Sequence, residues 1–306
     1  MKNIKNNALV VGVDIGGSHI SAALVDLKRK CLLPNTHIVR PVKSHGTVEE
    51  IMKAWADTIQ EVLNFHPLKT AHVGIAMPGP FDYEKCICYM ANVHKYDAIY
   101  GLNIKALLSE KLPIQPEDIL MRNDAEAFLE GEVMLGAANG FRKALGITLG
   151  TGLGTAVSRN GITEDAALGI NEPLFEGVAE DYISTRWFVK RYYELTGKTV
   201  KGVKELTELA EEDPSVQTIF DEFSQSLAAF IKIFVKKENP DVVVIGGKIA
   251  NASPFFMPKL MKEMMIYHNI VDFRKSWHDD AAPLIGAAYL WKKKVKTIVL
   301  ENSLEG

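Results

Sequence analysis

The chain has 306 residues, of which 47% are hydrophobic and 24% are charged. These fractions match those of globular proteins and exclude a largely disordered or fibrous chain, while the length is typical of two domains that each bury a core. The formal net charge is −3, and the most basic stretch is the short segment 292–296. A general nucleic-acid-binding surface is therefore not expected, and we expect no nucleic-acid partner.

Cysteine usage and hydropathy indicate the compartment in which the protein works. The three cysteines, Cys31, Cys86 and Cys88, form an odd set in a chain whose first residues show no secretory leader pattern. We therefore expect a reducing, cytoplasmic compartment. No apolar run approaches the roughly 18 residues that a membrane-spanning helix needs, so no membrane association is expected.

The first half of the chain alternates apolar strands with helical periodicity. Residues 8–13 and 20–27 are apolar runs on either side of Gly16-Gly17, which predicts a hairpin, and apolar positions three and four residues apart predict an amphipathic helix over 47–64. In chain order, the further predicted elements are a strand at 71–77 that ends in Pro78-Gly79-Pro80, a helix at 103–112, a strand at 118–121 and a helix at about 125–138.

The second half repeats this order. A strand at 143–149, a glycine-rich turn at 150–155 and a strand at 156–158 predict a second hairpin centred on glycines. No low-complexity linker is present, so we expect the domain boundary near 123–140. The remaining predicted elements are helices at about 178–195 and 215–238, a strand at 241–245 that ends in Gly246-Gly247, and a helix at about 284–294.

The turn after the first strand joins an acid, two glycines and a hydroxyl. Glycines let backbone N–H groups approach phosphate oxygens without a Cβ clash, so Gly16, Gly17 and Ser18 are predicted to bind phosphate. Asp14 can hold a hydrated Mg²⁺ ion beside them. A tight turn with an exposed Asp14 explains the same residues, and the local sequence leaves both interpretations open.

The glycine-rich turn of the second half and the glycine pair after its Val-rich strand are two further candidates. Ligands of open α/β sheets bind at the carboxyl ends of strands, which favours a nucleotide over Gly246 and Gly247. A structural turn and a helix-entry turn are the alternatives at these two places. Because each half has one glycine-rich loop, we interpret the loops as paired sides of a nucleotide-binding cleft. The predicted phosphate-binding residues of the second loop are Gly150, Thr151, Gly152 and Gly154.

Taken together, these motifs resemble the ROK family (repressor, open reading frame, kinase) of sugar kinases, within the actin, Hsp70 and hexokinase fold group. The matching segments keep the family's order over about residues 8–290, and the set is specific although each motif alone is weak. The segments are Asp14-Ile15-Gly16-Gly17-Ser18, Gly74-Ile75-Ala76-Met77-Pro78-Gly79-Pro80, Asn92, Arg122-Asn123-Asp124-Ala125, Leu149-Gly150-Thr151-Gly152-Leu153-Gly154-Thr155, Gly246-Gly247 and Leu284-Ile285-Gly286-Ala287-Ala288.

The resemblance implies an α/β fold of two actin-like (ribonuclease H-like) domains, each a mixed sheet flanked by helices, with a cleft between them. Residues 1–123 would form a phosphate- and sugar-binding domain and residues 124–306 a nucleotide-binding domain, with the helix at about 284–296 packing back on the first. Members of the family commonly form dimers, so a homodimer is a candidate assembly.

The implied activity is phosphorylation of a hexose, at the C6 hydroxyl of glucose or a related sugar, with ATP or polyphosphate as donor and with Mg²⁺ positioned by Asp14 through water. Asp124 would be the general base, because a sugar hydroxyl is a poor nucleophile until a carboxylate within about 2.6–3.2 Å takes its proton. An N-cap of the following helix is the alternative role for Asp124. The implied sugar-binding residues are Gly79, Asn92, Asn123, Asp124 and Glu180.

The sequence departs from the family's pattern after the second loop. Ala167 and Ile170 stand where the family has a Glu and a His that bind the C1 and C2 hydroxyls of the sugar, and no cysteine follows Cys88, so no structural zinc is expected. A modified sugar, such as a 2-deoxy or 2-acetamido hexose, is therefore a candidate substrate. The residues that could replace the lost contacts, or be exposed loop residues, are Asn171, Glu172 and Glu176.

Two other functions remain open. A chain that has lost these sugar contacts could bind sugar or nucleotide as a sensor without transferring phosphate. Another member of the actin-like ATPase group is the broader alternative, although the pair Asn123-Asp124, with Arg122 as its one basic neighbour, favours a polyol acceptor over an acid. The presence of both Asp14 and Asp124 favours catalysis.

Overall fold

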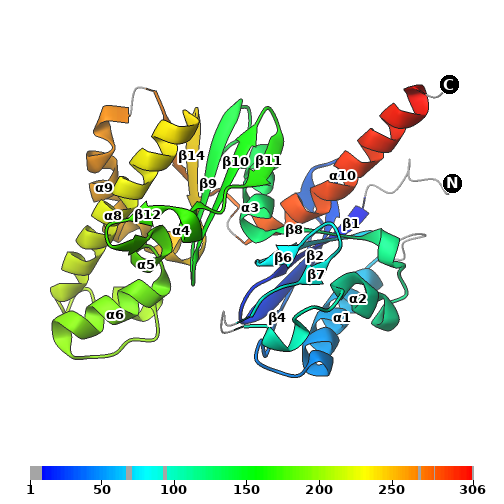
Figure 1. Ribbon diagram of the computed structural model, residues 1–306, viewed down its shortest axis with the longest axis horizontal. Coiled ribbons are helices and arrows are strands. Elements are labelled where there is room, and N and C mark those ends of the chain that lie inside the picture. The colour runs from blue at the N-terminus through cyan, green and yellow to red at the C-terminus, as the bar shows by residue number, and fades with distance from the viewer. Residues whose placement is uncertain (1–8, 67–70, 92–94, 268–269, 279, 305–306) are drawn as a thin grey trace. The chain divides into compact units, whose positions relative to one another are not determined.

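The computed structural model describes residues 9–66, 71–91, 95–267, 270–278 and 280–304 (Figure 1). The chain forms two compact units: the first comprises the residues up to Gly136 together with those from Asp280 onward, and the second comprises Ala137–Asp279. Each unit contains a β-sheet flanked by helices, which confirms the predicted α/β class. The assignment of phosphate, sugar and nucleotide binding to 1–123 and 124–306 stays a prediction.

Within the described residues, the main sheet of the first unit has six strands, with the central order β3-β2-β1-β5-β8 and with β4 paired to β2. Strands β1 and β2 form the predicted hairpin, whereas β1, β5 and β8 run parallel and therefore end at the same edge of the sheet. The strands are β1 (Leu9–Ile15), β2 (His19–Asp26), β3 (Cys31–Leu32), β4 (Ile38–Pro41), β5 (Val73–Met77) and β8 (Ile119–Asn123).

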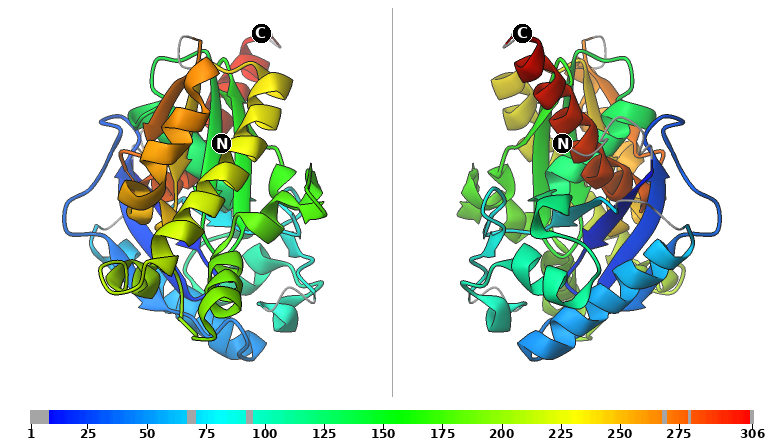
Figure 2. Two further views of the ribbon diagram at one scale, coloured as in Figure 1. Left: turned by 90° about the vertical axis from the view of Figure 1, so that its left-hand side faces the viewer. Right: turned by 90° about the vertical axis from the view of Figure 1, so that its right-hand side faces the viewer.

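Helices cover both faces of this sheet (Figure 2). Because side chains alternate along a strand, Val13 of β1 shares a core with Trp55 of helix α1 on one face, while Val10 packs with Tyr289 of helix α10 on the other. The remaining elements of this unit are α1 (Val48–Asn64), α2 (Ile104–Lys111), α3 (Asp124–Leu135), α10 (Ala281–Leu304), the short strands β6 (Phe81–Asp82) and β7 (Ile87–Cys88), and the 3-10 helices η2 (Asp97–Ile99) and η3 (Pro116–Asp118).

Helix α10 lies directly on the backbone of β5 and of α3 because the facing residues are glycines. A Cβ atom at Gly74 would lie 2.1 Å from the carbonyl oxygen of Ala287, and a Cβ at Gly286 would lie 1.8 Å from that of Ala127. Real Cβ atoms do not approach backbone this closely, so any side chain at these positions forces the helix away from its neighbours. Two glycines of the sequence motifs therefore have a packing role.

We expect the substitution Gly74→Ala to lower the free energy of unfolding by about 3 kcal/mol, the upper part of the usual cost of overpacking. The measurement is urea denaturation followed by tryptophan fluorescence, since Trp55 and Trp291 lie in this unit. The matched control is Gly202→Ala, where the added Cβ would meet its nearest neighbour, the Thr185 Cγ2, at an ordinary 3.5 Å. Equal midpoints for the two variants would contradict this packing role.

His72 is buried just before β5, at the opposite end of that strand from its carboxyl edge. Its ring stacks on Trp291 with centroids 4.0 Å apart, and its Nδ1 lies 3.1 Å from the Oδ1 of Asp118. Burial lowers the pKa of His72 below its ordinary value of 6.5, with a smaller contribution from Lys294, and this outweighs the opposing effect of the Asp118 carboxylate.

Because the pKa of His72 is lower in the folded than in the unfolded chain, the unfolded chain binds the proton more readily. We expect the free energy of unfolding to be constant with respect to this group above about pH 6.5 and to decline as the pH falls below it. The variant His72→Phe, which keeps an aromatic ring on Trp291, should show a shallower decline between about pH 7.5 and pH 5 in urea titrations. An identical decline in both proteins would rule out this contribution.

Within the described part of the second unit, the main sheet has five strands in the order β11-β10-β9-β14-β15. Strands β9 and β10 form the second predicted hairpin, and β9, β14 and β15 run parallel. Strand β15 is absent from the sequence prediction because three of its four residues are polar and none is fully buried. The strands are β9 (Lys143–Leu149), β10 (Leu153–Arg159), β11 (Ile162–Asp165), β14 (Val242–Gly246) and β15 (Asp272–Lys275).

The helices of this unit share a core rich in phenylalanine. The ring of Phe188 lies 5.1 Å from that of Phe220 and 4.7 Å from that of Phe223, which in turn meets Phe256 at 5.2 Å. The remaining elements are α4 (Leu168–Asn171), β12 (Pro173–Leu174), β13 (Gly177–Val178), α5 (Ala179–Tyr182), α6 (Thr185–Thr196), α7 (Val203–Glu208), α8 (Ser215–Glu238), η4 (Lys248–Ala252), α9 (Ser253–Glu263) and η5 (Met265–Tyr267).

The prediction of one helix over about 178–195 is wrong, because the structure has two helices there, α5 and α6. The backbone of Ser184 is extended between them, with φ −152° and ψ 162°. The N–H and the hydroxyl of Thr185 both donate to the carbonyl oxygen of Gly150 at 2.9 Å. This tertiary contact, which local periodicity does not register, replaces a turn of helix.

Among the described residues, no helix combines the length and apolarity that crossing a bilayer requires.

Candidate functional site

The carboxyl edge of the first sheet brings together residues that are far apart in the sequence. Asp14 on β1 is level with Ala76 on β5 and Arg122 on β8, and Asn123 pairs with Met77. The segments that follow these strands therefore leave the sheet side by side. They contain three predicted groups: the Gly16-Gly17-Ser18 turn, Gly79, and Asp124. The predicted sugar ligand Asn92 lies outside the described residues.

The first glycine turn is tightly organised by its own hairpin. The Gly16 N–H donates to the His19 carbonyl at 2.9 Å, and the Ser18 carbonyl accepts from the Val42 N–H at 2.9 Å. Gly17 and Ser18 are exposed. Because the Gly16 N–H is used within the turn, the backbone groups of Gly17 and Ser18 are the better candidates for an anion.

Tyr96, which the sequence analysis did not identify, supports this turn through a hydrogen bond to its backbone. Its side chain is fully buried, its ring meets Trp55 edge-on, and its hydroxyl donates to the carbonyl of Gly16 at 2.5 Å. Burial raises the pKa of Tyr96, with a further contribution from the charge of Asp14, so the hydroxyl keeps its proton as a donor. The neighbouring Lys95 brings its Cδ within 3.7 Å of where a Cβ of Gly17 would be.

Asn123, not Asp124, caps helix α3. The Asn123 Oδ1 accepts from the N–H groups of Ala125 and Glu126 at 2.8 and 3.1 Å, whereas Asp124 is the first helical residue. The alternative interpretation of Asp124 as the N-cap is therefore wrong. Asp124 is only partly buried, and its Oδ1 accepts from the Ala125 N–H at 2.9 Å. The cap holds the backbone of the predicted base in place.

A tyrosine links Asn123 to the predicted sugar-binding segment at Gly79. The Asn123 Nδ2 donates to the Tyr83 hydroxyl at 3.3 Å, and that hydroxyl donates to the Met77 carbonyl at 2.8 Å. A Cβ at Gly79 would lie 3.4 Å from the same hydroxyl. Asn123 and Met77 end neighbouring strands, and Gly79 follows one of them. Tyr83 joins these three residues into one polar cluster.

Arg122 points to the other face of the sheet and is not part of this cluster. Its guanidinium donates to the Gly286 carbonyl at 3.1 Å, pairs with Glu126, and lies 3.6 Å from Glu130. Glu130 is fully buried and pairs with Lys293 at 2.8 Å. The one basic residue within the motifs thus joins α3 to α10 rather than offering charge to a ligand.

The second glycine turn lies at the corresponding place in the second unit. The Gly150 N–H donates to the Gly152 carbonyl at 3.0 Å, and Thr151 is exposed at the tip. Gly154 lies within β10, opposite Thr148, and so belongs to the strand rather than to the turn. Among the predicted residues of this loop, Gly150, Thr151 and Gly152 form the turn itself.

Glu180 approaches this turn from helix α5. Its Oε2 accepts the Leu153 N–H at 2.9 Å, and its Oε1 accepts from Arg186 at 2.7 Å. A Cβ at Gly152 would lie 2.4 Å from the same Oε2. The predicted sugar-facing carboxylate thus contacts the turn, and a contact with sugar stays a prediction.

Gly247 brings the end of β14 against the base of the same turn. Its φ of +87° favours glycine, and a Cβ there would lie 2.6 Å from the Leu149 carbonyl. Gly246 is the last residue of β14, and Gly247 precedes the 3-10 helix η4. The helix-entry interpretation is therefore correct locally, and binding of a nucleotide over this glycine pair stays a prediction.

The segment that departs from the family pattern is ordered by hydrogen bonds. Ala167 has a φ of +48° at the start of α4, its N–H donates to Asp165 at 2.9 Å, and its carbonyl accepts from the Asn171 side chain at 2.8 Å. Ile170 is 58% exposed. Neither Ala167 nor Ile170 brings a polar side chain to this segment.

Of the proposed replacements, Asn171 and Glu172 have side-chain partners, whereas the contact of Glu176 is made by its backbone. Glu172 lies 3.8 Å from Lys237, and the Glu176 N–H donates to the Tyr182 hydroxyl at 3.3 Å. Among the residues that the structure describes, no three His, Cys, Asp or Glu side chains gather into a metal-binding group. A single carboxylate is nevertheless compatible with Mg²⁺, which proteins hold through one or two carboxylates together with water and substrate phosphates.

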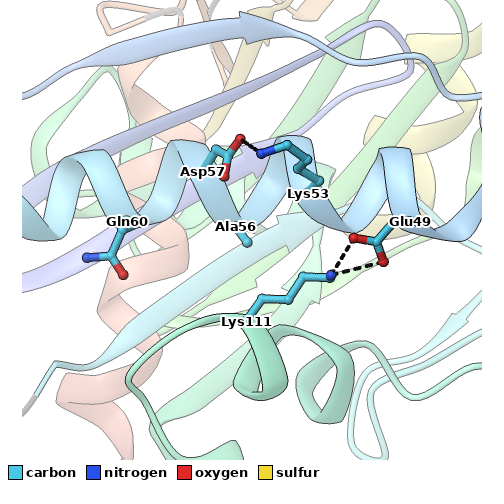
Figure 3. Close-up of a pocket in the computed structure, with 6 residues that line it drawn as sticks. All are labelled: Glu49, Lys53, Ala56, Asp57, Gln60 and Lys111. Carbon is cyan, nitrogen blue, oxygen red and sulfur yellow. Dashed lines mark hydrogen bonds and ion pairs between the residues drawn. The ribbon is translucent and has the colours of Figure 1, made fainter.

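A surface hollow between α1 and α2 is lined by ion pairs rather than by free polar groups (Figure 3). Lys53 pairs with Asp57 at 2.8 Å, and Lys111 pairs with Glu49 at 2.7 Å. Because these charges satisfy one another and include none of the predicted site residues, the hollow does not extend the candidate site. Its lining is completed by Ala56 and Gln60.

The two sheets, each with a glycine hairpin followed by parallel strands, define a two-domain α/β protein of the actin-like kind. The chain belongs to the ROK family, whose model matches residues 10–171 and 175–294. Two solved structures are similar to it over nearly its whole length. One is a ROK hexokinase from Thermus thermophilus (24% identity, 94% of this chain and 99% of that chain, TM-score 0.76). The other is an inorganic polyphosphate/ATP-glucomannokinase from Arthrobacter sp. strain KM (25%, 94% and 100%, TM-score 0.70). The predicted family and fold are confirmed.

Two curated relatives are named after sugar substrates. The glucokinase of Thermotoga maritima is 26% identical to this chain and the alignment covers 94% of this chain and 98% of the relative. The N-acetyl-D-glucosamine kinase of Pectobacterium carotovorum is 24% identical, with 91% and 97% covered. The relatives thus act on more than one hexose.

We expect the Tyr96→Phe substitution to loosen the first glycine turn, because the Gly16 carbonyl loses its buried donor. A net loss of about 1 kcal/mol for a hydrogen bond corresponds to exchange of the Gly16 amide hydrogen about five times faster. Hydrogen exchange measured residue by residue tests this. Tyr192→Phe is the matched control, since it removes a hydroxyl that donates to Asp213 at 3.0 Å in the second unit. Equal exchange at Gly16 in both variants would contradict the role of Tyr96.

Proposed function

We propose that the protein is a sugar kinase that transfers a phosphoryl group to a hexose hydroxyl, at C6 of glucose or a related sugar. The observation that carries the proposal is the position of Asp14, Asn123 and Asp124 along one edge of parallel strands, in a chain of the ROK family. The glucokinase and N-acetylglucosamine kinase names of the relatives support it.

Asp124 acts as the general base in this proposal. Its carboxylate is partly exposed at the start of α3, where a sugar hydroxyl can reach it, and the cap at Asn123 fixes its backbone. Taking the proton as the bond to phosphorus forms is typically a 10²–10⁴-fold effect. Gly79 and Asn92 would hold neighbouring hydroxyls, with Tyr83 keeping the segment near Asn123 in place.

In this proposal the phosphoryl donor is ATP or polyphosphate, and each glycine turn is a candidate phosphate-binding loop of its own unit. The exposed backbone at Gly17, Ser18 and Thr151 offers N–H donors to phosphate oxygens, and Gly246-Gly247 would lie under the adenosine. When bound, Mg²⁺ neutralises phosphate charge, and Asp14 would hold it through water. The Arthrobacter glucomannokinase, which is named for both donors, is a reason to test both.

The sugar could carry a modified C2 group. Ala167 and Ile170 supply no polar side chain in the segment after the second turn, so hydroxyls that the family binds there would lose their partners. A hexose with an acetamido group in place of the C2 hydroxyl is therefore a candidate substrate beside glucose. The relatives named N-acetyl-D-glucosamine kinase give independent support for this second substrate class.

The state of the cysteine thiols supports a proposal for the compartment in which the protein works. Within the described residues, Cys31, Cys86 and Cys88 are all free. Burial raises the pKa of the Cys86 and Cys88 thiols, which makes them poor nucleophiles and inert in a reducing compartment. We propose a cytoplasmic location. Because members of the family commonly form dimers, we separately propose a homodimer as the assembly.

The experiment is an ADP-release assay across glucose, mannose, N-acetylglucosamine and N-acetylmannosamine, with polyphosphate tested in parallel by detection of the sugar phosphate. We expect Asp124→Asn to lower kcat by about 10²–10⁴-fold with little change in sugar affinity. The matched control is Asp57→Asn on the outer face of α1, which should leave kcat unchanged. Undiminished turnover in Asp124→Asn would contradict the assignment of the base.

A sensor that binds sugar without transferring phosphate is the second candidate, and the nonpolar Ala167 and Ile170 are the observation that favours it. Calorimetry distinguishes the two functions. Sugar binding without product from any donor would favour the sensor, whereas product formation with any sugar of the panel would exclude it.

A further inference from the structure

The second glycine turn is held at both of its ends by one short segment of the chain. At one end, the Leu153 N–H donates to the Glu180 Oε2 at 2.9 Å. At the other, the Gly150 carbonyl accepts from the N–H and the hydroxyl of Thr185, both at 2.9 Å. Helix α5, which provides Glu180, lies beside α4 and β12 (Figure 1), and Thr185 begins α6. Residues 180–186 therefore fix the shape of the turn.

Both oxygens of the Glu180 carboxylate have partners. While Oε2 accepts from Leu153, Oε1 accepts from Arg186 at 2.7 Å. The Glu180 side chain is 19% exposed and that of Arg186 is 62% exposed, so the pair extends from the turn to the surface. A carboxylate this close to a phosphate-binding turn would repel an anionic ligand, and the guanidinium offsets that charge.

Gly152 makes room for this carboxylate. A Cβ at Gly152 would lie 2.4 Å from the Glu180 Oε2 and 3.1 Å from its Cδ. No protein atom other than those of Glu180 would meet that Cβ as closely. A side chain at position 152 would therefore displace the end of the Glu180 side chain from the Leu153 N–H.

We propose that Glu180, paired with Arg186, is a positioning residue for the phosphate-binding turn, beyond the sugar contact that the family resemblance implies for it. It holds the Leu153 end of the turn so that the backbone N–H groups around Thr151 stay directed at the phosphates. This inference rests on the proposed function and specifies how its second turn works.

The first test compares Glu180→Ala with Glu180→Gln. Calorimetry with Mg²⁺ and a non-hydrolysable ATP analogue, without sugar, measures donor affinity. We expect Glu180→Ala to weaken binding about tenfold, and Glu180→Gln, which keeps an acceptor for the Leu153 N–H, to recover part of that loss. A tenfold rise in sugar KM with unchanged analogue affinity would overturn the proposal and return Glu180 to the sugar.

The second test uses the Arg186 partner with a matched control on the same helix. Arg186→Gln should weaken analogue binding several-fold, because the Glu180 charge is left unneutralised. Arg191, also on α6, pairs with Glu222 of α8 at 2.7 Å. The substitution Arg191→Gln breaks this pair and should leave analogue affinity unchanged. Equal effects of the two substitutions would overturn the charge-balancing role.

The third test pairs Gly152→Ala with Glu180→Ala. If the carboxylate is what excludes a Cβ, Gly152→Ala should weaken analogue binding at least tenfold in the wild-type background and less than threefold in the Glu180→Ala background. Equal losses in both backgrounds would assign the glycine to the phosphate alone and overturn this part of the proposal.

Hydrogen exchange separates the positioning role from the proposed function. In Glu180→Ala, the Leu153 amide hydrogen should exchange about tenfold faster, while amides of the first glycine turn are unchanged. Unchanged exchange at Leu153 would overturn the positioning role alone. If the wild-type chain binds neither the analogue nor a polyphosphate chain, the proposed function and the positioning role both fall.

Discussion

The contact of helix α10 with the bare backbone of β1 and β5 is the constraint on which the first unit depends. A Cβ at Gly12 would lie 2.2 Å from the Leu284 carbonyl, and Gly74 meets Ala287 in the same way. The helix comes from the far end of the chain, and its Trp291 Nε1 donates to the Val73 carbonyl at 3.0 Å across 218 residues. The helix thereby covers one face of β1 and β5, which lie inside the sheet, while β8 pairs with β5 at its edge.

The parallel pairing of β1, β5 and β8 determines which residues meet at their carboxyl ends. Because β1, β5 and β8 are held in register, the residues that leave them emerge together, and Asp14, Gly79 and Asp124 reach one edge without any local signal that joins them. The buried network of Arg122, Glu126 and Glu130 then ties β8 and α3 to α10. The chemistry at the edge thus depends on packing on the opposite face of the sheet.

The sequence predicts the two glycine hairpins and the long strands that form the centre of each sheet, because their signals are local, whereas the shorter strands are not predicted. Apolar runs and glycine pairs identify both hairpins, and the family motifs point to Asp124. The sequence does not predict contacts between residues that are far apart in the chain. Tyr96 binds Gly16 across 80 residues, and Thr185 interrupts a helix to bind Gly150 across 35 residues. The cap of α3 is misassigned for another reason, since Asn and Asp cap helices about equally well and only the register distinguishes Asn123 from its neighbour.

The two glycine turns are alike in sequence but are supported by different chemistry. The first is held by a neutral, buried hydroxyl at Tyr96, and a positively charged Lys95 lies against it, so the support adds no negative charge where phosphate would bind. The second is held by the carboxylate of Glu180, which requires both the space left by Gly152 and the compensating charge of Arg186. The two turns therefore differ in the space and charge of their surroundings. A substitution that is tolerated at one turn need not be tolerated at the other, because the neighbouring support, rather than the shared motif, determines how much space and charge each turn can accept.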